Sequence, residues 1–254
     1  MGSRNESARE KYLGKIYDTK NYGEVLVTEY ENSHNVTVKF LNTNYITKVF
    51  VGSLLNGSIK DWSLPSVYNI GYRDCGEDTE GSHRKVSRLW SSILLRCYDK
   101  RWQINHQSYS DCTVSDNFKY FSKFKDWYYK QIGHDQEGWH LDKDILVKGN
   151  KVYSEETCCF VPNEINLLFV KSNKTRGDFP IGVSFCKYHN RFVANIRKNG
   201  TRKYLGYSNN AETAFYYYKE AKEAYIKEVA NKWKDQIDIR TYTSLLNYKV
   251  EITD

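Results

Sequence analysis

One short segment of the chain places three titratable side chains at alternate positions, namely His140, Asp142 and Asp144. Alternate residues of a β-strand point to the same side of the sheet, so an imidazole and two carboxylates would form one row. Such groups exchange protons and bind cations. Lys143 stands between the two acids, and the alternative is a structural cluster in which its ammonium bridges them while Asn150 pins the following loop.

A second chemical feature is a run of cations between residues 187 and 203, which contains no acidic residue in a chain of net charge +7. Its cations are Lys187, Arg191, Arg197, Lys198, Arg202 and Lys203. With a period of two, the first strand of this run turns Arg191, Val193, Asn195 and Arg197 to one side and its apolar residues to the other. The pattern predicts a surface that faces a polyanion, and a solvated basic sheet face is the alternative.

A hairpin and a helix are the elements that would position these cations. The pair Asn199–Gly200 predicts a tight turn, because both residues tolerate positive φ. In the returning strand, Leu205 and Tyr207 are expected to face the core, with Arg202 and Tyr204 outward. A helix follows, capped by Asn209 with Glu212 three residues further on. Its apolar residues repeat with helical spacing and are Ala211, Ala214, Phe215, Tyr218, Ala221 and Tyr225. The expected structure is a three-stranded sheet with one helix behind it.

The motifs Gly182–Val183, Phe192–Arg197 and Tyr204–Tyr207, with the alanine-rich helix, resemble the APETALA2 (ethylene-response-factor-like) DNA-binding domain. The resemblance implies a domain over residues 175–232 whose sheet lies in the major groove of double-stranded DNA. By position it implies these contact residues: Asn195, Arg197, Arg202 and Tyr204, with Lys187 and Arg191 near the first turn. Arginine and asparagine can each form paired hydrogen bonds with base edges, whereas lysine mostly contacts phosphate.

Upstream, the sequence predicts a strand at Trp139–Leu146, a polar loop, a second strand at Cys158–Val161 and a helix that opens near Pro162 and Asn163. This strand, loop, strand and helix resemble the ββα-metal fold of HNH endonucleases. Together with Trp90–Cys97, they also resemble bacteriophage HNH-type proteins that carry an APETALA2-type domain downstream.

The HNH resemblance implies one divalent metal, Mg²⁺ or Mn²⁺, held between Asp142 on the strand and Asn166 on the helix, with Asp144 as a second acidic candidate. It also implies a histidine that activates water. Lys143 stands at the place of that histidine, so His140 is the substitute base, and Asn150 is the candidate for the orienting asparagine. A protonated lysine is a poor base.

The remaining segments complete an α+β, multidomain prediction. Residues 1–72 read as a small β-barrel similar to Src-homology-type barrels, with strands at Glu24–Tyr30, Asn35–Leu41 and Tyr45–Val51. This barrel could bind a host or phage protein. The polar stretch Arg73–Ser82 reads as a linker.

Two further regions of the chain remain, the central region and the C-terminal tail. The HNH resemblance implies a central domain over residues 83–171, in which Arg88 and Arg96 are expected on a basic helix suited to phosphates. Residues 233–254 form a tail that ends in a terminal strand or a docking segment.

Composition places limits on the class of protein. No run of about 18 apolar residues is present, so no membrane partner is expected. The first residues lack the apolar core of a secretion signal. Six cysteines without regular spacing favour free buried thiols in a reducing compartment, hence the cytoplasm, that of the host cell if the protein is phage-encoded.

The sequence leaves two functions open. One is a metal-dependent, HNH-like homing endonuclease that binds double-stranded DNA, favoured by Asp142, Asn150 and Asn166. The other is a catalytically inactive factor of the same build that binds DNA or a host protein in a transcriptional or anti-defence role. Lys143 favours this second function.

Overall fold

The computed structural model describes residues 2–75, 83–170 and 178–254, and it belongs to the expected mixed α+β class. The chain divides into two compact units. The first contains the residues up to Ser110 together with Asp116–Lys125, and the second contains Asp111–Ser115 together with Asp126–Asp254. Most of the expected linker, residues 76–82, lies outside the described residues, and so does the predicted domain boundary between residues 171 and 175.

The first unit begins with a meander of four antiparallel strands in the order β1-β2-β3-β4. The elements are α1 (Gly2–Tyr12), β1 (Ile16–Thr19), β2 (Gly23–Asn32), β3 (Asn35–Phe40), β4 (Ile46–Val49) and α2 (Val51–Asn56). The expected β-barrel is therefore wrong: within the described residues, β1 and β4 are the two edges of an open sheet and do not pair. Each edge strand has only four residues, which is short for the strong tilt that barrel closure requires.

Alternating β-branched and aromatic residues explain why this sheet forms. Val25 and Val27 of β2 and Val36, Val38 and Phe40 of β3 are at most 1% exposed, while their neighbours in the sequence are more exposed. These residues form one apolar core, closed from outside the sheet by Leu54 of α2 and Ile59. The sequence pattern predicted β2, β3 and β4 but not β1, α1 or α2.

A helical part completes the first unit. It contains α3 (Arg84–Tyr98), α4 (Lys100–Ile104), η2 (Gln107–Tyr109), η3 (Asn117–Lys119) and the start of α5 (Phe121–Tyr128). The buried face of α3 carries Trp90, Ile93, Leu94 and Cys97, as its helical spacing predicts. The indole nitrogen of Trp90 donates to the Phe118 carbonyl at 2.7 Å, which ties α3 to η3.

The second unit opens with two small two-stranded sheets. In one, β5 (Thr113–Val114) pairs in parallel with β7 (Val152–Tyr153). In the other, β6 (Trp139–Asp142) pairs antiparallel with β8 (Cys159–Pro162), and α6 (Asn163–Asn166) and η4 (Leu167–Phe169) follow directly. The expected order of strand, loop, strand and helix is present, although the helix is a single turn.

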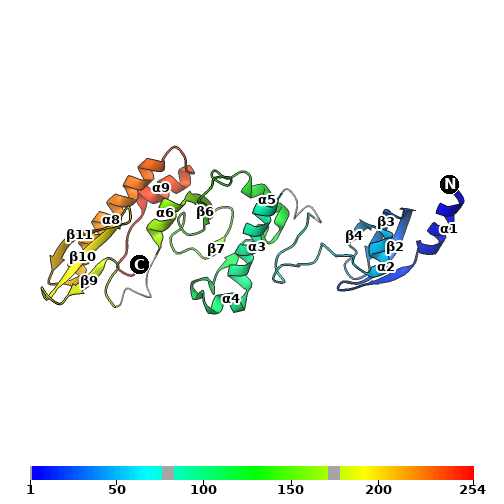
Figure 1. The fold of residues 1–254 in the computed structure, drawn as a ribbon, viewed down its shortest axis with the longest axis horizontal. Coiled ribbons are helices and arrows are strands. Elements are labelled where there is room, and N and C mark those ends of the chain that lie inside the picture. Colours follow the sequence, from blue (N-terminus) through cyan, green and yellow to red (C-terminus); the bar gives the residue numbers. More distant parts are fainter. Residues whose placement is uncertain (1, 76–82, 171–177) are drawn as a thin grey trace. The chain divides into compact units, whose positions relative to one another are not determined.

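The end of the chain forms a three-stranded antiparallel sheet and two helices (Figure 1). The strands are β9 (Val183–Cys186), β10 (Arg191–Lys198) and β11 (Thr201–Ser208), and the helices are α8 (Ala211–Trp233) and α9 (Ile239–Asn247). One face of the sheet packs on α8, where Ala194 and Ile196 meet Ala214, Phe215 and other buried residues. The predicted sheet and helix are thus both present.

Two details of this region differ from expectation. Asn210, not Asn209, caps α8, and its side-chain oxygen accepts from the backbone of Glu212 and Thr213. The tail contains the helix α9, which was not expected. Of the two structures expected for its last residues, a terminal strand or a docking segment, the described residues form the second: Val250 is buried, and its backbone N–H donates to Glu223 of α8 at 2.9 Å.

Candidate functional site

The outward face of the β9–β11 sheet brings together the residues that the sequence selected. In the antiparallel register, Arg197 lies opposite Arg202 and Asn195 lies opposite Tyr204. Arg191 begins β10 on the same face, one strand repeat from Val193. The helix α8 covers the other side of the sheet (Figure 1), and Arg191, Arg197 and Arg202 on the outward side are exposed.

A β-bulge in β11 changes this face. Ala194 pairs with Gly206 while Asn195 pairs with Tyr204, so Leu205 is an extra residue on the returning strand. Beyond the bulge, the residues of β11 that face the core and those that face outward exchange places. The expectation that Tyr207 faces the core is therefore wrong: its ring is 38% exposed and lies 5.0 Å from that of Tyr204. Leu205 is partly buried against the core, as expected.

Aromatic rings extend this face beyond the two tyrosines. The His189 ring lies 4.9 Å from Tyr207 and 4.8 Å from Tyr188, which is 90% exposed. These residues come from the turn between β9 and β10, which also holds exposed Lys187. The sequence pattern singled out Tyr204 but missed the other rings, because neither the turn nor the bulge has a periodic signal.

The cations of this region divide between the two faces. Within the described part of the chain, Arg191, Arg197 and Arg202 are exposed and form no ion pair. Lys198 behaves differently, because its ammonium lies 2.7 Å from the Glu228 carboxylate and 4.7 Å from the Tyr225 ring centre, both on α8. The outward face thus keeps its arginines available for a ligand.

Asn195 occupies the middle of the outward face. Its backbone N–H donates to the Gly182 carbonyl at 2.9 Å, which fixes the start of β9 against β10. Its side-chain nitrogen Nδ2 is inaccessible to solvent and has no hydrogen-bond partner among the described residues. An unpaired buried amide is costly, so this atom lowers the stability of the sheet.

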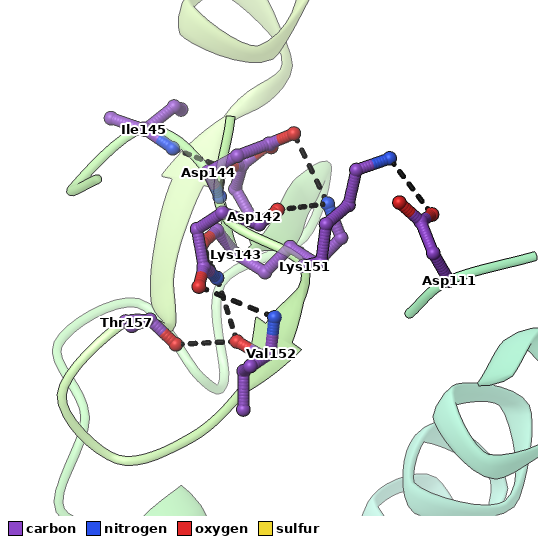
Figure 2. Close-up of polar contacts among 9 residues, drawn as sticks. Asp111, Asp142, Lys143, Asp144, Ile145, Lys151, Val152 and Thr157 are labelled. Carbon is purple, nitrogen blue, oxygen red and sulfur yellow. Dashed lines mark hydrogen bonds and ion pairs between the residues drawn. The ribbon is translucent and has the colours of Figure 1, made fainter. Parts of the chain in front are cut away.

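The acidic segment forms a tight loop after β6. Asp142 Oδ1 accepts from the backbone N–H groups of Asp144 and Ile145, each at 2.8 Å (Figure 2). Burial, followed by the charge of Asp144, raises the pKa of Asp142 to about 6. The carboxylate of Asp142 is therefore engaged in shaping the loop.

Lys143 is the centre of this loop. Its side chain is 9% exposed, and its ammonium lies 3.1 Å from both Asp144 Oδ2 and the Asn150 carbonyl oxygen. Burial alone would lower the pKa of Lys143, but the charge and hydrogen bond of Asp144 raise it. The side-chain amide of Asn150 donates to the carbonyls of Lys143 and Val152, both at 2.7 Å. The Lys143–Asp144 pair and the Asn150 hydrogen bonds agree with the structural cluster that was the alternative to a metal site.

Two contacts around this loop had no signal in the sequence. The Tyr153 ring centre lies 5.9 Å from the Lys143 ammonium. Lys151 pairs with Asp111, which precedes β5, at 3.1 Å. The second contact joins the two segments that the parallel pairing of β5 with β7 brings together from distant parts of the sequence.

The other predicted metal and catalytic residues do not join this cluster. His140 is exposed on β6, and within the described residues its imidazole forms no hydrogen bond with Asp142. Asn166 ends α6, and its side chain likewise forms no bond there to either acid. The described residues contain no group of three or more histidine, cysteine or acidic side chains placed to hold a metal.

Metal chemistry can be tested against the donors that are present. Asp144 is neutralised by a buried ammonium, and one oxygen of Asp142 already accepts two backbone bonds. A divalent cation would have to displace the Lys143 ammonium against like-charge repulsion. The arrangement therefore does not fit Mg²⁺ or Mn²⁺.

Arg88 and Arg96 belong to the first unit, on α3. Arg88 is exposed, whereas the half-buried Arg96 guanidinium lies 5.9 Å from the Tyr109 ring centre. The six cysteines form no disulfides with one another, and four of them are buried. No helix among the described residues is long and apolar enough to cross a membrane.

Comparison with protein families, curated proteins and solved structures finds no match to this chain. A functional assignment therefore depends on the geometry of the two sites and on general chemistry.

Proposed function

We propose that this protein binds double-stranded DNA through the outward face of the β9–β11 sheet. The observation that carries the proposal is the set of exposed arginines, Arg191, Arg197 and Arg202, which have no ion pair among the described residues. Arginine is the side chain best suited to phosphate and to guanine edges. The resemblance to APETALA2 domains points to the same face and to the major groove.

The uncharged groups on this face support the same ligand. Tyr204 and Tyr207 offer exposed rings with hydroxyl groups, and Asn195 lies opposite Tyr204 in the middle of the face, with its Nδ2 atom inaccessible to solvent. Amide and hydroxyl groups bind base edges and phosphate oxygens, while rings pack on sugars. A rigid sheet supported by α8 holds these groups in fixed positions, which favours a regular duplex over a flexible strand.

A binding factor without catalysis agrees better with the acidic loop than an endonuclease does. The Lys143 ammonium lies where a cation between Asp144 and the Asn150 carbonyl would otherwise sit. We therefore propose the non-catalytic alternative. The role of the N-terminal sheet in binding a host or phage protein stays a prediction.

Electrophoretic mobility shifts with a random duplex pool test the binding face. Arg197→Ala and Arg202→Ala should each weaken binding roughly tenfold and lower the salt slope by about 0.9. Lys227→Ala is the matched control, since it removes an exposed cation from α8. Equal affinities for all three variants and the unaltered protein would move recognition to another surface.

Incubation with supercoiled plasmid in Mg²⁺, Mn²⁺ or EDTA tests the absence of catalysis. We expect mobility shifts without nicking in all three conditions. Metal-dependent nicking that disappears in Asp142→Ala and Asn166→Ala would instead establish the endonuclease.

A further inference from the structure

The second unit contains a cavity of about 840 Å³, whose lining shares Arg197 with the proposed DNA interface. Its walls come from η4, the loop before β9, the β10–β11 hairpin, α8 and the last residues of the chain. The volume is that of a site for a small organic molecule. Tyrosine rings and aliphatic side chains form much of the wall, including Tyr218, Tyr225, Tyr248, Leu168 and Ile196.

Lys222 is the distinctive polar residue of this cavity. It lies one helical turn from Tyr218 on α8, so both side chains line the same wall. Among the described residues, its ammonium forms neither an ion pair nor a hydrogen bond. Desolvation by burial lowers the pKa of Lys222 to about 8, and no carboxylate opposes this shift. A partly buried cation without a partner would be stabilised by an anion.

The acidic residues of the wall do not supply that anion. Glu164 lies 2.6 Å from the Lys232 ammonium and also accepts from the Trp233 indole nitrogen at 2.8 Å. Asp254 lies 2.8 Å from the Lys148 ammonium. Each of these carboxylates already has its own lysine, so neither is committed to Lys222.

We propose that the cavity binds a small organic anion, a carboxylate, sulfonate or phosphate joined to an apolar ring, whose charged group pairs with the Lys222 ammonium. The ring would pack among Tyr218, Tyr225 and Tyr248. Arg197 also lines the cavity and adds a second positive charge at its edge. The test of this proposal is separate from that of the DNA interface, because it uses Lys222 of α8, which is not part of that interface, and contains no DNA.

The aromatic sulfonate 8-anilinonaphthalene-1-sulfonate is a suitable probe, because it combines an anion with apolar rings. We expect it to bind the full chain at one site, and Lys222→Met should raise its dissociation constant roughly tenfold or more. The uncharged analogue N-phenyl-1-naphthylamine controls for the cavity itself, and its affinity should be the same for both proteins. Unchanged sulfonate affinity in Lys222→Met would overturn the proposal, and so would the absence of binding.

Protection from chemical modification tests the same site without any substitution. Reductive methylation followed by mass spectrometry should show Lys222 protected when the sulfonate is bound. Lys227, which is exposed on the same helix, is the internal control and should be modified equally with and without the probe. Equal modification of Lys222 in both conditions would show that the anion binds elsewhere and would overturn the proposal.

Discussion

Asp142 is the residue whose ionisation the fold changes most clearly near neutral pH. Its pKa rises from 3.8 to about 6, because burial and Asp144 disfavour the charged form. The folded protein therefore holds a proton that the unfolded chain has released between these two pH values. The stabilising contribution is complete below pH 4 and is lost as the pH rises through 6.

Replacing this carboxylate by a neutral amide tests that account. In Asp142→Asn the oxygen can still accept from Asp144 and Ile145, but the buried charge is gone. At pH 8 the free energy of unfolding should rise by up to about 3 kcal/mol, and the gain should vanish near pH 4. Urea denaturation at several pH values measures the difference.

Asp144→Asn is the matched control for that prediction and should have the opposite sign. Asp144 balances the buried Lys143 ammonium, so its loss should destabilise the fold at pH 8. A gain in stability from both substitutions would contradict the ion pair that the structure places at the centre of the loop.

At the scale of elements, the β9–β11 sheet depends on two glycines with positive φ. Gly182, at φ 78°, precedes β9, and a Cβ there would overlap the Tyr218 ring. Gly200, at φ 76°, lies in the β10–β11 turn, and a Cβ there would meet nothing within 4 Å. Substitution of Gly200 would therefore introduce backbone strain alone, whereas substitution of Gly182 would add steric overlap to it.

Alanine at each position should therefore have a different cost. Gly200→Ala should lower the free energy of unfolding by about 1 to 2 kcal/mol, the cost of a left-handed backbone. Gly182→Ala should lower the free energy of unfolding by roughly 3 kcal/mol or more, since the overlap with the Tyr218 ring adds to the backbone strain. Chemical denaturation of the two variants measures both values, and equal costs would mean that α8 can move away from the loop before β9.

The elements also show where periodicity succeeds and where it fails. Alternation predicted the two faces of β10, and Asn199–Gly200 adopts positive φ at both residues as a tight hairpin requires. The bulge at Leu205 has no signal in the alternation, so the orientation of Tyr207 was predicted wrongly. The residue that caps α8 lies one position after the predicted one, because Ser208, Asn209 and Asn210 are adjacent and all have side chains suited to capping.

At the scale of the whole molecule, separate cores stabilise separate parts of the chain. The core of the N-terminal sheet and that of the β9–β11 region share no residue. Leu54 belongs to the first core and is 1% exposed. Leu54→Ala should lower the free energy of unfolding of this part by about 2 to 5 kcal/mol. Hydrogen exchange should speed up in β1–β4 and stay unchanged in β9–β11 and α8. A uniform increase would show that the two units unfold as one.

Local sequence was sufficient for features that depend on neighbouring residues. The α+β class, the strands β2, β3, β10 and β11, the buried stripe of α3 and the cationic face of β10 all follow from spacing and turn chemistry. These features use contacts within a few residues of the chain, which periodicity records directly.

The tertiary structure alone decided what distant segments do to one another. It left the N-terminal sheet open, docked Val250 on α8, and enclosed Lys222 in a cavity built from five separate segments. It also placed the Lys143 ammonium between Asp144 and the Asn150 carbonyl. The energies of these contacts depend on burial and on partners far along the chain. A linear pattern of residue types records neither the burial of a side chain nor the identity of its distant partners.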